Sequence, residues 1–223
     1  GVIGGAGGIE KIGDGRLVLE ADHTFTGETL VGGGTTELVG SIAGDATVEA
    51  AGRLEASGTI GGDLTADGGT IAPGASIGTL AVGGDLLASS GSTFEIELDP
   101  DTLSADLLDV AGSATFGTGT TLSLSALGSG QFSDGDTFNI LSADGGLVDN
   151  GAVIEGSFDD VSFSVQAGAN DLQLVAALEA ALGVAVDVGD VLLQPETPDQ
   201  QIALDVSGGA DVAGFDLALQ VGD

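Results

Sequence analysis

Short stretches of alternating apolar and polar residues follow one another along the chain, with turn residues between them. The dipeptide Gly-Asp recurs at residues 44, 62 and 84, at spacings of 18 and then 22 residues. Each dipeptide is followed by two apolar residues separated by one position: Ala46 and Val48, Leu64 and Ala66, and Leu86 and Ala88. Alternation with a period of two predicts half-buried strands, and a repeat near twenty residues predicts one turn, or rung, of a parallel β-helix.

The last fifth of the chain has a different pattern. Residues 176–188 fit either a short helix or a continuation of the strand before them, and the pattern leaves both open. The domains we expect are a parallel β-helix over residues 1–175, a linker over 176–194 and a C-terminal β-strand extension over 195–223, which is either part of a sandwich or a donor of strands. Two alternating stretches in the extension predict a self-association surface formed by Ile202, Leu204, Val206, Phe215, Leu217, Leu219 and Val221.

The composition favours thin aliphatic layers over a spherical core. Hydrophobic residues make up 42% of the chain, but they include only eight Phe and no Trp, Tyr, Met or Cys. Stacked rungs of a solenoid need few large aromatic side chains. The 41 glycines have no three-residue period, which excludes collagen, and regularly spaced aliphatic residues argue against disorder.

The charge of the chain is strongly one-sided. Asp and Glu number 35, against only Lys11, Arg16 and Arg53, which gives a net charge of −32. Such a surface repels phosphate backbones and anionic lipids, so we expect neither a nucleic-acid partner nor insertion into a membrane. An acidic surface attracts cations, and it makes copies of the chain repel one another. The chain begins at Gly1 without an initiator Met, so we expect it to be processed, excised or partial.

Three stretches carry a family resemblance. Residues 13–40, with the pattern G-x-G-x-L-x-L followed by T-F-T-G-x-T, resemble the passenger-associated β-strand repeat of bacterial autotransporters. Residues 68–116, which include A-P-G-A-S-I-G-T-L-A-V-G-G-D, resemble the end of such passengers, and residues 136–158 continue the likeness. The resemblance implies a right-handed parallel β-helix, or β-solenoid, displayed outside a bacterial cell. Residues 192–223 resemble the first strands of a cohesin-like β-sandwich.

Candidate chemistry is sparse. Asp99, Asp101 and Asp106 form an oxygen-rich loop of the kind that calcium prefers, although it lacks the central glycine and final glutamate of an EF-hand, and the alternative is a screened acidic loop. The adjacent Asp159 and Asp160 are the obvious pair of carboxylates for glycoside hydrolysis, but neighbouring residues on a strand face opposite ways, which favours a solvated turn.

His23 is the only histidine of the chain, and no catalytic serine or cysteine motif surrounds it. We therefore interpret it as a turn residue and not as a general base.

These patterns predict a non-enzymatic, extracellular structural or adhesive β-solenoid at a bacterial surface. We expect its partners to be other copies of itself, joined head to tail in a filament through open rungs and the C-terminal strands, together with surface glycans or cations. No cofactor is expected beyond calcium. Two alternatives remain open: a carbohydrate-active β-helix enzyme, and a calcium-dependent binding module.

Overall fold

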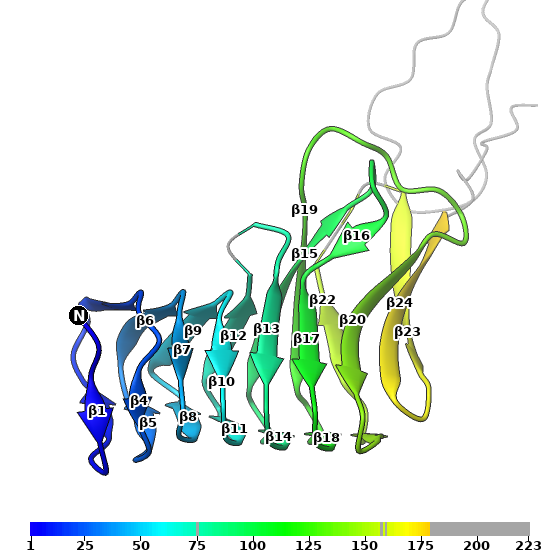
Figure 1. The fold of residues 1–223 in the computed structure, drawn as a ribbon. Coiled ribbons are helices and arrows are strands. Elements are labelled where there is room, and N and C mark those ends of the chain that lie inside the picture. Colours follow the sequence, from blue (N-terminus) through cyan, green and yellow to red (C-terminus); the bar gives the residue numbers. More distant parts are fainter. Residues whose placement is uncertain (75, 157, 159, 179–223) are drawn as a thin grey trace, which may run out of the picture. The chain divides into compact units, whose positions relative to one another are not determined.

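The structure, a computed structural model, describes residues 1–74, 76–156, 158 and 160–178. Within them the chain coils as a parallel β-helix, and Figure 1 shows its rungs stacked side by side from the blue N-terminal strands to the yellow ones. From β5 to β20 each rung contributes one strand to each of three sheets, and strands of successive rungs pair in parallel over most of the stack. The parallel β-helix predicted from the sequence is therefore confirmed.

The first sheet comprises β2 (Ile9–Lys11), β5 (Thr29–Val31), β8 (Ala46–Glu49), β11 (Leu64–Asp67), β14 (Leu86–Ala88), β18 (Ala114–Phe116) and β21 (Leu147–Asp149). The second comprises β3 (Arg16–Leu19), β6 (Gly34–Leu38), β9 (Gly52–Ala56), β12 (Thr70–Pro73), β15 (Thr93–Asp99), β19 (Thr121–Ala126) and β22 (Val153–Glu155). The third comprises β7 (Ser41–Ile42), β10 (Thr59–Ile60), β13 (Thr79–Val82), β17 (Leu107–Val110), β20 (Thr137–Ala143), β24 (Asp171–Leu178) and β23 (Val161–Ala167). Two short strands, β1 (Gly4–Gly5) and β4 (Thr24–Phe25), pair with each other, and β16 (Ser104–Ala105) pairs with β15.

The core consists of columns of apolar side chains that run along the stack. In the first sheet Ala46, Leu64 and Leu86 lie in register on successive strands, and all three are buried. These residues follow the three Gly-Asp dipeptides, so the repeat in the sequence is the repeat of the core. Every second side chain of a strand points inward, which is why the alternating pattern marks the buried positions.

The aspartates of the Gly-Asp dipeptides link one rung to the next. The Asp45 Oδ1 atom accepts a hydrogen bond from the backbone N–H of Asp63 (2.9 Å), and the Asp63 Oδ1 atom accepts one from Asp85 (2.8 Å). The Asp85 Oδ1 atom continues the series by accepting from the N–H of Ser113 (2.7 Å). Each side chain thus satisfies a backbone donor at the corner of the following rung, where the sheets change direction.

This series also explains the glycine of the second and third dipeptides. A Cβ atom at Gly62 would overlap the Asp45 Oδ1 atom, and one at Gly84 would overlap the Asp63 Oδ1 atom. The aspartate of one rung therefore occupies the space that a side chain would need in the next.

Strand direction reverses at the end of the stack farthest from the N-terminus. Strand β24 pairs with β20 in the antiparallel sense, and β23 then pairs antiparallel with β24 (Figure 1). Phe132, Phe138, Phe158 and Phe163 form a cluster there, with neighbouring ring centroids 5.1 to 6.2 Å apart. This hairpin and its aromatic cluster cover the last parallel strand of the third sheet.

The compact unit that contains the β-helix spans Gly1–Glu179, and a second unit spans Ala180–Asp223. Residues 176–178, for which both helix and strand were open, belong to β24. Strand β24 therefore takes up the first three residues of the predicted linker. Residues 179–194 of that linker and the C-terminal extension with its seven apolar residues lie outside the described residues. No helix among the described residues is long and apolar enough to cross a membrane.

Candidate functional site

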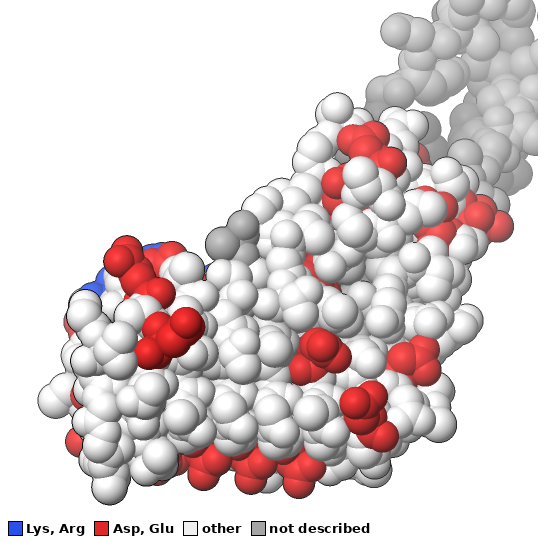
Figure 2. Space-filling view, viewed as in Figure 1, with Lys and Arg blue, Asp and Glu red and all other residues white. Residues whose placement is uncertain are grey.

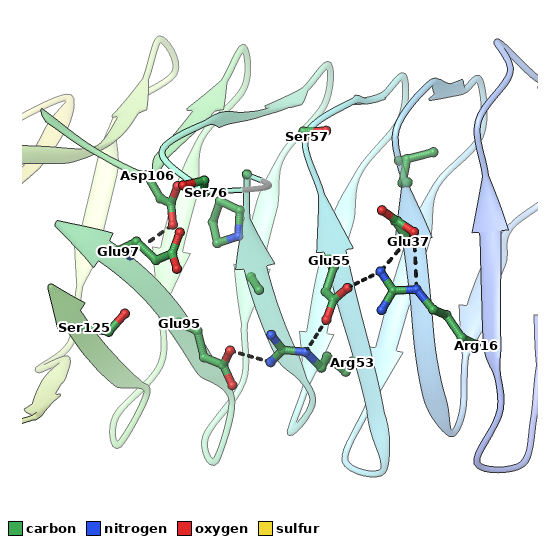
Figure 3. A pocket seen from close by; sticks show the side chains of 14 residues that line it. Arg16, Glu37, Arg53, Glu55, Ser57, Ser76, Glu95, Glu97, Asp106 and Ser125 are labelled. Carbon is green, nitrogen blue, oxygen red and sulfur yellow. Dashed lines mark hydrogen bonds and ion pairs between the residues drawn. The ribbon is translucent and has the colours of Figure 1, made fainter. Parts of the chain in front are cut away.

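A network of charged side chains lies on the outer face of the second sheet (Figure 3). The Arg16 guanidinium pairs with Glu37 (2.9 Å) and Glu55 (2.8 Å), each on a later rung than Arg16. Arg53 contacts Glu55 on its own strand (3.0 Å) and Glu95 on β15 (2.5 Å). Because β12 lies between β9 and β15, the Arg53 side chain reaches across one whole rung.

A hollow of about 270 Å³ lies along this network. The strand that Arg53 crosses presents the small side chain of Ala72 in register with Glu55 of β9, one position after the pair that Ile71 forms with Phe94 of β15. The hollow extends toward Glu97, Ser76 and Asp106, which Figure 3 shows gathered at its far end. A small residue between two rungs of longer ones thus creates the depression.

Asp106 connects two segments at the edge of the hollow. It is only 2% exposed, and its carboxylate accepts hydrogen bonds from the backbone N–H groups of Gly78 (2.9 Å) and Glu97 (3.0 Å). Burial raises the pKa of Asp106 to about 6; the two backbone donors oppose this shift, and the negative charge of Glu97 adds to it. With both oxygens occupied by backbone donors, Asp106 is placed to hold the chain after Gly74 against β15.

We expect the stability that Asp106 confers to decrease as the pH rises. Its pKa in the folded chain, about 6, lies above the ordinary value of 3.8, so folding favours the protonated form. The contribution is complete below pH 3.8 and is lost as the pH passes through 6. Denaturant unfolding of the wild type and of Asp106→Asn at several pH values measures this, and the difference between the two free energies of unfolding should change by about 2 kcal/mol between pH 4 and pH 7.5. A difference between the two free energies of unfolding that stays the same at every pH would contradict this prediction.

The structure does not gather the three aspartates of the predicted calcium loop around one point. The Asp99 carboxylate accepts hydrogen bonds from the Thr102 hydroxyl (2.7 Å) and from the Asp101 backbone N–H (2.9 Å). These bonds lower the pKa of Asp99, and the bond from the hydroxyl contributes most. The Asp106 carboxylate is engaged elsewhere, as described above. Among the described residues, no three His, Asp or Glu side chains are grouped so as to hold a metal ion. Loop position in the sequence gave no information about the direction in which each carboxylate points.

The other residues considered for chemistry are also separate. Asp160 is exposed and has a positive φ of 59°, as expected at a tight turn, while its neighbour Asp159 lies outside the described residues. His23, interpreted from the sequence as a turn residue, is buried, and its Nδ1 atom accepts a hydrogen bond from the backbone N–H of Ile3 (3.0 Å). Its Nε2 atom has no hydrogen-bond partner among the described residues.

The charged network on the second sheet could not be found from the sequence. Arg16 and Glu55 are far apart in the chain, and their contact depends on the register of strands in rungs of unequal length. The same holds for Lys11, whose Nζ atom donates to the carbonyl oxygens of Ile12 and Gly13 and to that of Gly33 on the next rung. Figure 2 shows Lys and Arg only toward the N-terminal end of the visible face, where acidic groups surround them.

Comparison with known proteins gives partial matches, and no family model matches the chain. An extracellular serine protease of Serratia marcescens is 38% identical over 96 residues, which is 43% of this chain and 9% of that protein. The adhesin BmaC autotransporter of Brucella suis is 46% identical over 57 residues, or 25% of this chain and 2% of the adhesin. The autotransporter lipoprotein NalP of Neisseria meningitidis is 40% identical over 67 residues, or 30% of this chain and 6% of NalP.

The likeness is to autotransporter passenger proteins. It covers less than half of this chain in each case, and the chain spans less than a tenth of the length of each of these relatives. The resemblance expected from residues 13–158 is thus supported in its general form. The cohesin-like interpretation of residues 192–223 concerns residues outside the described ones, and none of these matches supports it.

Proposed function

We propose that this chain is a non-enzymatic scaffold segment of an extracellular or surface-displayed bacterial protein of the autotransporter-passenger type. The observation that carries the proposal is the variety of the proteins it resembles: one is named as a protease, one as an adhesin and one as a lipoprotein. The same kind of segment occurs in proteins whose names indicate different activities. A structural role that these proteins share explains this better than any single activity does. The stacked rungs are the structure that such a task requires.

The chemistry of the described residues supports the same proposal. A serine hydrolase of the usual type needs a histidine within hydrogen-bonding distance of a hydroxyl nucleophile. The chain has one histidine, and His23 is buried with its Nδ1 atom bonded to the backbone of Ile3. Around the hollow, Arg16 and Arg53 are paired with glutamates of the same sheet, an arrangement that ties rungs together.

A carbohydrate-active enzyme is the competing function, because the hollow contains Glu97 beside Asp106, whose raised pKa is a property of many general acids. The burial of Asp106 and its two backbone donors favour a structural role for this carboxylate.

The proposal is tested by incubating the purified 223-residue chain with casein and with a panel of bacterial and plant polysaccharides. We expect no hydrolysis above that of a heat-denatured sample. The chain carrying Glu97→Gln is the test variant and the chain carrying Ser125→Ala, at the same hollow, is its control. Hydrolysis that is lost in Glu97→Gln but kept in Ser125→Ala, with unchanged thermal unfolding of both, would overturn the scaffold proposal in favour of the enzyme.

A further inference from the structure

Strand β23 forms the edge of the third sheet, and among the described residues its only partner within that sheet is β24. Its sequence from Val161 to Ala167 is VSFSVQA, which contains no charged residue although the whole chain has a net charge of −32. Edge strands of soluble proteins are usually protected by charges, by proline or by being short. With seven residues, β23 is among the longer strands of the molecule and has none of these protections.

The two faces of β23 differ in character. Val161, Phe163 and Val165 point toward the core and are each only half-buried, whereas Ser162 and Ser164 are exposed. Phe163 contributes to the aromatic cluster at this end of the stack. The inward face of the edge strand is thus apolar and incompletely covered by the described residues.

The order of residues in β23 is the same in both directions about Phe163, since residues 161 to 165 read V-S-F-S-V. If two such strands lie antiparallel about a two-fold axis at Phe163, each Val161 lies opposite the partner's Val165 and each Ser162 opposite the partner's Ser164. The two Phe163 rings then lie opposite each other. Apolar pairs fall on one face and serine pairs on the other, which are the pairings that stabilise antiparallel strands.

We propose that two copies of this chain associate through antiparallel pairing of their β23 strands, which joins their third sheets into one continuous sheet. The interface is self-complementary, as a two-fold dimer requires. Two chains that each carry a net charge of −32 repel one another where their acidic surfaces meet. Strand β23 carries no charge, so two copies can approach each other there with less repulsion. Just outside the strand, Asp160 would lie opposite the partner's Gln166, so no like charges are opposed.

The charge argument also predicts how the dimer responds to salt. Pairing a single strand edge buries little area, so the association is of the weak, concentration-dependent kind. Salt screens the repulsion between the two acidic chains, so we expect the dimer dissociation constant to fall as the salt concentration rises from 0.05 to 0.5 M. Sedimentation velocity of the full 223-residue chain over a range of concentrations measures this. A strict monomer under all these conditions would overturn the proposal.

Two double variants test the proposed register. Ser162→Glu with Ser164→Glu places glutamates opposite glutamates across the two-fold axis, and Ser162→Lys with Ser164→Lys places lysines opposite lysines. Within the chain these positions neighbour Ala177 and Val175 of β24, so neither variant opposes a charge in the monomer. We expect the dissociation constant of each variant to rise at least about tenfold. An equal mixture of the two should dimerise again, because glutamate then faces lysine.

The mixture also shows that both variants are folded. Effects that follow net charge alone would contradict the proposal: the lysine variant, which is less negative than the wild type, would then dimerise more strongly instead of less. An unchanged dissociation constant in both variants would show that the chains associate through another surface and would likewise overturn it.

Discussion

Replacing Phe94 by alanine is expected to lower the free energy of unfolding by about 4 kcal/mol, the largest effect of any single substitution considered for this chain. Phe94 is fully buried on β15, in register with Ile71 on the preceding rung and Leu122 on the following one. Its ring centroid lies 5.1 Å from that of Phe116, on a neighbouring sheet. Alanine would leave a cavity bounded by three rungs, and paired backbones on both sides restrict the collapse that could fill it.

Urea unfolding followed by circular dichroism measures this effect. Leu87→Ala is the matched control, because Leu87 is a large apolar residue that lies 47% exposed on the outer face of β14. We expect a change below about 1 kcal/mol for the control. Similar losses at both positions would mean that the columns of inward-facing residues do not form the core.

The substitution Gly84→Ala is expected to destabilise the chain by about 2 kcal/mol, as overpacking a well-packed site does. The new methyl group would collide with the Asp63 Oδ1 atom, which accepts a hydrogen bond from the N–H of Asp85. Either this bond breaks or the corner of the rung shifts. The φ of Gly84 is not positive, so the cost arises from the collision and not from the backbone conformation.

Gly15→Ala is the control for this experiment. Nothing lies within 4 Å of a Cβ atom built at Gly15, and its φ is also not positive, so we expect no loss and a small gain from the reduced freedom of the unfolded chain. Thermal unfolding of the two variants gives the comparison. The combination of Gly84→Ala with Asp63→Ala should lose less stability than the sum of the two single variants, because removing the carboxylate removes the closest of the contacts that the new methyl group would make. Strict additivity would refute the explanation.

The fold could be predicted from the sequence because the same repeating pattern determines both the strands and the way in which successive strands align. Alternation within a strand separates inward from outward side chains, as at Leu64 and Ala66, and repetition of the Gly-Asp corner aligns one strand with the next. The resemblance to autotransporter passengers added an independent reason for the same conclusion. The corner itself was interpreted only as a turn, since a hydrogen bond from one rung to the next leaves no mark within a single repeat.

Most of the candidate site could not be predicted from the sequence. Contacts on the outer face depend on which residues share a register position in rungs whose lengths differ. Ala72, for example, has no special meaning in the sequence until it is known to lie in register with Glu55 on one side and beside the strand of Glu95 on the other. Asp106 was grouped with Asp99 because they are close in the chain, but β16 folds back along β15 and directs Asp106 toward Gly78 and Glu97. Residues that are close in sequence were therefore wrongly expected to lie together, because the chain reverses between them.

The placement of the three basic residues has a consequence for the resistance of the chain to proteolysis. Enzymes of the trypsin class cut only after lysine or arginine, and this chain offers them just Lys11, Arg16 and Arg53 in 223 residues. Each of these side chains is bound to a carbonyl or carboxylate of a later rung, and each arginine also lies within a paired strand. Digestion would require the stack to open first, so the same contacts that tie the rungs together shield the few bonds that such enzymes could attack.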